Sequence, residues 1–305
     1  MRLKRKTFIF IFFIIFPIFC AKAISKNFSI KLSGGYAIMI NKGGDLETLF
    51  DSSSDYWDFM SKVGNWTSGS HTFTQYKNSY PDINLEILIN SKTKDFFYAF
   101  GIEVGLISRK WNPNFQYSYQ GLAPSDKIQG KLEFNINFIP VVFSGYMVFP
   151  IGNSFKINLG GGWGIYFSRL KIIQSQIYSL LDYNYSIGDK IIFQGRSIET
   201  GPQFKIGLEQ RIFSKFALAI DCLYRFTTGF SDLQGTVNWE IEDSSWGTYK
   251  ESYDNQFLWL GENSIGEKKY YFLAYDFNKK SYENVDKFKF WLEDFVIRMG
   301  IKFYF

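Results

Sequence analysis

Apolar and polar residues alternate with a period of two along eight stretches of this chain. Such alternation predicts β-strands, because successive side chains of a strand point to opposite faces. In the last stretch Phe305, Phe303 and Ile301 share an apolar face, whereas Lys302 and Arg298 share the other. The predicted strands are residues 28–40, 83–90, 96–109, 131–149, 155–168, 198–212, 216–230 and 288–305.

The fourth stretch, 131–149, contains a proline that interrupts its alternation. Before Pro140, the apolar outer face is predicted to carry Leu132, Phe134, Ile136 and Phe138, with Glu133, Asn135 and Asn137 on the inner face. Proline has no ladder donor, so we expect a bulge or a change of parity at Pro140.

Long and short connections alternate strictly between the predicted strands. The short ones are 91–95, 151–154 and 213–215, and the long ones are 41–82, 111–130, 171–197 and 231–287. A closed even-stranded sheet with both ends on one side needs this order, whereas a soluble sandwich does not. We therefore predict an all-β chain: a closed antiparallel up-and-down transmembrane β-barrel of eight strands. Residues 256–260 and 269–277 alternate enough to add two strands, so ten is the alternative count.

The first residues have the pattern of an export signal. Basic residues precede the apolar run 8–19, and Ala21-Lys22-Ala23 follows it. The run is shorter than the roughly 20 residues of a spanning helix, so residues 1–23 are predicted to be a signal peptide and 24–305 the barrel. Five of the 34 Lys and Arg residues lie in 1–23, so the remaining 29 match the 29 Asp and Glu residues. The basic charge thus gives no reason to expect nucleic acid as a partner.

The terminal order of Arg298, Gly300, Phe303 and Phe305 resembles the C-terminal assembly signal of Gram-negative outer-membrane β-barrels. Together with the strand order, the chain resembles the eight-stranded group that includes the OmpA membrane domain and the OmpW-like proteins. The resemblance implies a location in the bacterial outer membrane, contact with outer-membrane lipids and insertion by the barrel assembly machinery.

Charges of both signs fall on the predicted inner face. An interior of eight strands is just wide enough for side chains to fill, and buried charges must pair. A gated polar conduit and a structural plug of ion pairs are both open, and the narrow interior favours the plug. The predicted ion-pair residues are Glu103, Glu133, Glu209, Asp221, Arg225, Arg298 and Lys302, with Lys31, Lys156, Lys205, Arg211 and Asp294 on the same face.

The first long loop, 41–82, carries helix-like spacing and the single histidine. One or two short helices are predicted there, and Tyr56, Trp57, Phe59 and Met60 are candidates for a lid or for contact with an apolar ligand. Catalysis on lipids around His71 is the alternative from another class, although a lone loop histidine is usually only solvated. No catalytic residue, cofactor or metal site is predicted.

The predicted function is therefore a non-enzymatic outer-membrane barrel. Its role is either structural, with surface interactions through long loops, or the narrow passage of small solutes, apolar ones among them.

Overall fold

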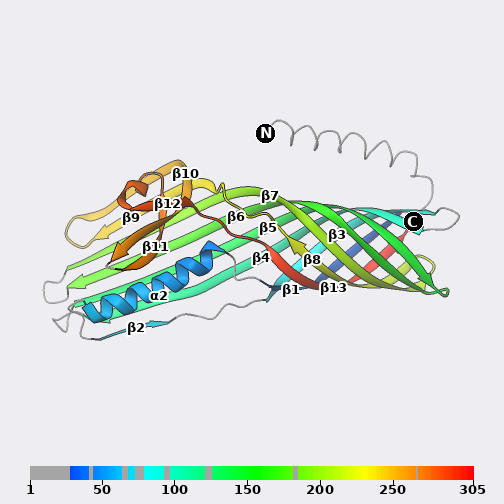
Figure 1. Ribbon diagram of the computed structural model, residues 1–305, viewed down its shortest axis with the longest axis horizontal. Coiled ribbons are helices and arrows are strands. Elements are labelled where there is room, and N and C mark those ends of the chain that lie inside the picture. Colours follow the sequence, from blue (N-terminus) through cyan, green and yellow to red (C-terminus); the bar gives the residue numbers. More distant parts are fainter. Residues whose placement is uncertain are drawn as a thin grey trace.

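The computed structural model describes residues 28–40, 44–63, 68–72, 79–92, 97–120, 126–180, 185–265 and 267–305 (Figure 1). The predicted export signal, residues 1–23, lies outside the described residues.

Eight strands form a closed antiparallel ring. They are β1 (Phe28–Met39), β3 (Ser79–Lys92), β4 (Phe97–Gln120), β5 (Asp126–Ile151), β6 (Phe155–Leu180), β7 (Tyr185–Phe213), β8 (Phe216–Phe226) and β13 (Glu293–Tyr304). Each strand pairs with the next in this order, and β13 closes the ring by pairing with β1, where Ile30 lies opposite Phe303. The predicted all-β class and ring of eight antiparallel strands are confirmed.

Strands β4 to β7 continue far beyond the ring and build an extension at one end of the molecule (Figure 1). The β6–β7 ladder is unbroken from Phe155 opposite Gln210 to Leu180 opposite Tyr185. The prediction of long loops at 111–130 and 171–197 is therefore wrong: most of these residues belong to two long hairpins. The outer face of the extension is rich in charged residues, and this composition is typical of loops, which is why the sequence predicts loops there.

Among the described residues, five further strands belong to the extension rather than to the ring. They are β2 (Ser68–Thr72), β9 (Gln234–Asp243), β10 (Gly247–Ile265), β11 (Lys268–Tyr275) and β12 (Asn284–Lys287), with a 3₁₀ turn η2 (Lys279–Ser281). Strand β7 pairs with β9 along its first half and with β8 along its second. The two additional strands predicted near 256–277 exist within β10 and β11, but they do not enter the ring, so the alternative count of ten is wrong.

One continuous helix, α2 (Asp45–Val63), occupies the part of the first long loop where one or two short helices were predicted. It packs on β11: Leu46 and Leu49 are buried, and the ring of Tyr56 lies 5.4 Å from that of Tyr270. The Asp45 carboxylate accepts a hydrogen bond from the Lys289 amide at 2.6 Å, which fixes the start of the helix. Within the described ranges, no helix is long and apolar enough to cross a membrane.

The inward-facing side chains differ in polarity between the ring and the extension. In the ring, Leu32, Ile83 and Ile206 face outward and are more than half exposed, while the inward positions combine charged and polar side chains with apolar ones such as Ala99 and Val142. In the extension, the inward side chains form an apolar core that includes Phe134, Phe138, Ile172, Phe193 and Phe230.

This reversal corrects the prediction for the fourth stretch. Leu132, Phe134, Ile136 and Phe138 point into the core, and Glu133 lies outside. The β5–β6 register is continuous across Pro140, and the irregularity with β4 lies between Trp111 and Phe115 instead. The parity of β5 therefore does not change at Pro140. Its inward side chains before Pro140 line the apolar core of the extension, and those after Pro140 line the interior of the ring.

Candidate functional site

The ring interior gathers charged side chains from β1, β3, β4, β7, β8 and β13. Strand register brings the first of these together: Lys31 lies opposite Glu86, and Glu86 lies opposite Glu103. Two neighbouring carboxylates on one face are unfavourable unless each meets a base, and the opposite wall of the ring supplies those bases.

Nine of these side chains form one continuous row of ion pairs, in which acids and bases alternate without exception. We call this row the lumen chain. Its nitrogen–oxygen distances run from 2.5 to 3.2 Å, and every member is buried. In order, its members are Asp221, Lys31, Glu86, Lys205, Glu103, Arg298, Asp82, Arg225 and Asp294.

Arginine and lysine each bridge two acids in this row. Arg298 reaches Asp82 and, at 2.6 Å, Glu103, while Arg225 reaches Asp82 and Asp294. Charge-assisted hydrogen bonds of this kind are about twice as strong as neutral ones. Removing one partner of a buried pair typically costs about 3–5 kcal/mol, because the other charge stays desolvated.

A second, smaller group of charges lies near the chain end of β13. Lys302 donates to Glu209 at 2.8 Å, and Lys156 lies 3.6 Å from the same carboxylate. Tyr304 also donates to Glu209, and the Arg211 guanidinium lies 4.8 Å from the Tyr304 ring centroid. Arg211 is exposed, so this group marks the edge of the ring rather than its centre.

Tyrosine side chains and glycines complete the packing. Tyr146 donates to Glu86 at 2.5 Å, and Tyr80 donates to Asp294. The inward positions of β6 near these rings are glycines: a Cβ atom on Gly160 would collide with Tyr146, and one on Gly164 with Tyr166. The glycine-rich segment of β6 thus leaves the space that these large side chains occupy.

The charged side chains pack around a small cavity. A cavity of about 10 Å³ lies between Lys31, Glu86, Tyr146 and Glu209. That volume is about the minimum for one water molecule. The arrangement can hold strands in register, and it fills the interior around this cavity with paired side chains.

The structure brings together six of the seven predicted ion-pair residues. Glu103, Asp221, Arg225 and Arg298 lie in the lumen chain, and Glu209 pairs with Lys302 beside it. The prediction for Glu133 is wrong: it faces outward and pairs with Lys131, since β5 keeps one parity throughout.

Two members of the lumen chain were missed. Asp82 lies one residue before the predicted start of its strand at 83, and Glu86 lies within that strand but is not among the predicted ion-pair residues. The signal for both was present: the period of two around Ile83, Leu85 and Ile87 extends back to Asp82.

The predicted lid residues lie in α2, away from the lumen chain. Tyr56 and Phe59 pack against Tyr270, at 5.4 and 6.0 Å between ring centroids. The side chains of Trp57 and Met60 lie outside the described residues, as does that of His71, whose backbone pairs with Tyr117 in the β2–β4 ladder. Across the described ranges, no three His, Cys, Asp or Glu side chains are grouped as a metal ion would need.

Comparison with known proteins gives remote structural similarity alone. No family model matches the chain, and no curated protein shows significant sequence similarity to it. The chain is similar to a major outer membrane protein from Thermus thermophilus, with 10% identity, a TM-score of 0.36, and 92% of this chain and 100% of that one covered. A Pseudomonas aeruginosa FadL homologue matches with 6% identity, a TM-score of 0.18 and coverage of 92% and 91%.

Proposed function

We propose that this protein is a non-enzymatic outer-membrane β-barrel that conducts no solute and holds a rigid β-extension above the membrane. The apolar outer face of the ring supports the membrane location. On β6 the outward positions from Phe155 to Phe167 are apolar apart from Gly161, which is enough for the 9–11 residues of a spanning strand. Soluble proteins rarely expose contiguous apolar surface on this scale.

The lumen chain carries the proposal that the barrel is closed. An ion channel needs a continuous polar path, whereas here opposite charges meet at 2.5–3.2 Å, and the cavity beside them has a volume of about 10 Å³. A path for solutes would require several ion pairs to separate together, at a cost of several kcal/mol for each desolvated charge. A structural plug is therefore favoured over the narrow passage of small solutes.

The extension supports a role at the cell surface. Strands β4 to β7 carry their hydrogen-bond ladders beyond the apolar band, and α2 packs across β11 on the same end of the molecule (Figure 1). Rigid elements of this size present a defined surface to partners outside the membrane, which mobile loops do not.

The proposal includes the export and assembly steps. Residues 1–23 would direct the chain to the periplasm, and the end of β13 would be recognised by the barrel assembly machinery. Phe303 and Phe305 are exposed on the outer face, where a membrane-embedded partner reaches them. Gly300 lies beside Ser33 of β1, and Arg298 belongs to the lumen chain, so their contribution is to strand closure.

Planar-bilayer recording tests the closed lumen. The refolded wild-type chain is expected to insert without stepwise conductance. The double variant Lys205→Ala/Arg298→Ala removes two bridging bases and is expected to give small, brief conductance steps. The matched control is Lys131→Ala/Glu133→Ala on the outer face, expected to be silent. Stepwise conductance of the wild type, unchanged by the lumen substitutions, would sink the proposal and favour narrow passage.

A further inference from the structure

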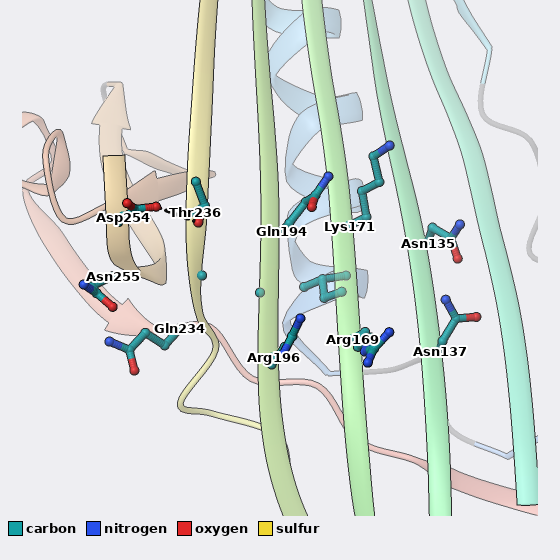
Figure 2. A pocket seen from close by; sticks show the side chains of 13 residues that line it. Asn135, Asn137, Arg169, Lys171, Gln194, Arg196, Gln234, Thr236, Asp254 and Asn255 are labelled. Atoms are coloured by element: carbon teal, nitrogen blue, oxygen red, sulfur yellow. Dashed lines mark hydrogen bonds between the residues drawn. The ribbon is translucent and has the colours of Figure 1, made fainter. Parts of the chain in front are cut away.

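A groove of about 840 Å³ lies on the outer face of the extension, where β5, β6, β7 and β9 run side by side (Figure 2). Its floor is a grid of polar side chains in two cross-strand rows. Asn137, Arg169, Arg196 and Gln234 are register partners in the first row, and Asn135, Lys171, Gln194 and Thr236 are partners in the second.

Three basic side chains in this grid lack acidic partners. Arg169, Lys171 and Arg196 are exposed, and none forms an ion pair with any residue in the described ranges. Arg169 and Arg196 lie directly opposite each other, an arrangement that destabilises an antiparallel pair. Of the described residues that line the groove, Asp254 alone is acidic, and its carboxylate accepts a hydrogen bond from Thr236 at 2.9 Å. The uncompensated charges point to an anionic ligand.

The position of the grid says which kind of anion. One step along the strands towards the ring, the outward residues are Ile139, Phe167 and Ile198, which are register partners and are all exposed. The basic row therefore lies immediately beyond the last apolar row. A lipid whose chains lie against the apolar row would place its headgroup at Arg169 and Arg196.

We infer that this groove binds the phosphorylated headgroup of a membrane lipid. Two arginines and one lysine offer forked and single N–H donors to phosphate oxygens, and the flanking amides of Asn137 and Gln194 add neutral donors. The neighbouring Ile139, Phe167 and Ile198 hold the acyl chains. The inference rests on the proposed membrane location, since it needs the apolar row to face lipid.

Native mass spectrometry of the refolded chain in neutral detergent tests this inference. Phosphatidic acid is expected to bind more tightly than phosphatidylcholine with the same acyl chains. A basic residue near a charged headgroup contributes about fivefold to affinity. The variant Arg169→Gln/Lys171→Gln/Arg196→Gln should therefore bind phosphatidic acid about 100-fold more weakly. Equal binding of the two lipids, or an unaffected triple variant, would overturn the inference.

Matched variants separate charge from folding. Lys215→Gln/Lys268→Gln/Lys280→Gln removes three exposed charges outside the groove and is expected to leave lipid binding unchanged. Arg169→Lys/Arg196→Lys keeps the charges but loses the forks, and should retain binding to within about tenfold. Displacement of phosphatidic acid by equimolar inorganic phosphate would show a site for a free anion, which also contradicts the inference.

Flotation with vesicles distinguishes failure of this inference from failure of the proposed function. If wild type and triple variant both insert into phosphatidylcholine vesicles but neither prefers phosphatidic acid, the membrane location stands and the lipid site falls. If neither inserts, the proposed function itself is wrong.

Discussion

Glu103 illustrates how completely one side chain depends on its surroundings. It is fully buried, and its two oxygens meet Arg298 at 2.6 Å and Lys205 at 3.2 Å. Substitution Glu103→Gln keeps the shape but leaves both bases short of one negative charge. We expect it to lower the free energy of unfolding by about 3–5 kcal/mol.

The matched control is Glu133→Gln, because Glu133 pairs with Lys131 on the outer face, where an ion pair contributes about 0–1 kcal/mol. Urea unfolding in vesicles, followed by tryptophan fluorescence, measures both. Equal effects of the two substitutions would show that the lumen chain does not stabilise the ring.

Asp276 gives a pH-dependent prediction outside the ring. Burial raises the pKa of its carboxyl group, but hydrogen bonds from the Phe257 amide, the Trp259 indole and Lys279 outweigh burial, so the pKa lies below its ordinary 3.8. Because the folded-state pKa is lowered, the stabilisation is present above pH 3.8 and is lost as the pH falls through the folded-state value.

Hydrogen exchange of the β10–β11 hairpin, corrected for intrinsic rates, checks this dependence. Protection is expected to decrease below pH 3.8, and Asp276→Asn should weaken protection at pH 7 and flatten the dependence. The exposed Asp286→Asn is the control. A pH profile that is the same in the wild type and in Asp276→Asn would contradict the assignment.

The alternation predicts the inward or outward orientation of most side chains in the ring, but its prediction for Glu133 is wrong. The pattern states which residues share a face, and it does not state which face is inside. In the ring, lipid would meet the apolar face, whereas in the extension the core does, as Phe134 and Phe138 show. Whether the apolar face points outward or inward depends on the distance of a residue from the membrane. The period of two gives no information about that distance.

Helix α2 is the element whose removal should affect the extension alone. Leu46 and Leu49 are almost fully buried, whereas Thr48 on the same helix is exposed. Leu46→Ala and Leu49→Ala are each expected to lower the local opening free energy of α2 and β11 by about 2–5 kcal/mol. Amide exchange measures this, with Thr48→Ala as control. Loss of protection throughout the ring would contradict the separation of the two parts.

The helix was predicted in the right place but too short. Ser52, Ser53 and Ser54 are of a residue type that is common at helix starts, so the sequence favours short helices over one long helix. In the structure the Ser53 hydroxyl donates to the Leu49 carbonyl at 2.7 Å, and the Ser52 hydroxyl accepts from the Tyr271 amide at 2.5 Å. These hydroxyls bond within the helix and to β11, so the helix continues. The contact with β11 joins residues far apart in the sequence, so no local pattern predicts it.

The same limit explains the strand lengths. Beyond Phe167, the outward residues Arg169 and Lys171 are charged, and such a composition is typical of a loop. Pairing with β5 and β7 on both sides nevertheless keeps these residues in strands, from Arg169 opposite Asn137 and Arg196 to Leu180 opposite Asp126. Sheet partners therefore outweigh local polarity in the extension.

Across the whole molecule, the polarity of the interior and of the outer face reverses at the edge of the proposed membrane. The ring has an apolar outer face and charged interior, and the extension has a polar outer face and apolar core. One set of strands, β4 to β7, makes this change without a break between β5, β6 and β7. The change falls between the row of Phe167 and the row of Arg169, which is where the proposal puts the outer boundary of the membrane.

A spin-label scan along the outer face of β6 tests this central claim most directly. Single cysteines at Leu159, Trp163, Phe167, Arg169 and Lys171, in a chain whose native cysteines are replaced by serine, would be labelled and reconstituted in vesicles. Labels through Phe167 are predicted to collide with oxygen and to be shielded from a water-soluble nickel chelate, and labels from Arg169 onward should show the reverse. Equal access of the chelate at all five positions would contradict a membrane-spanning ring.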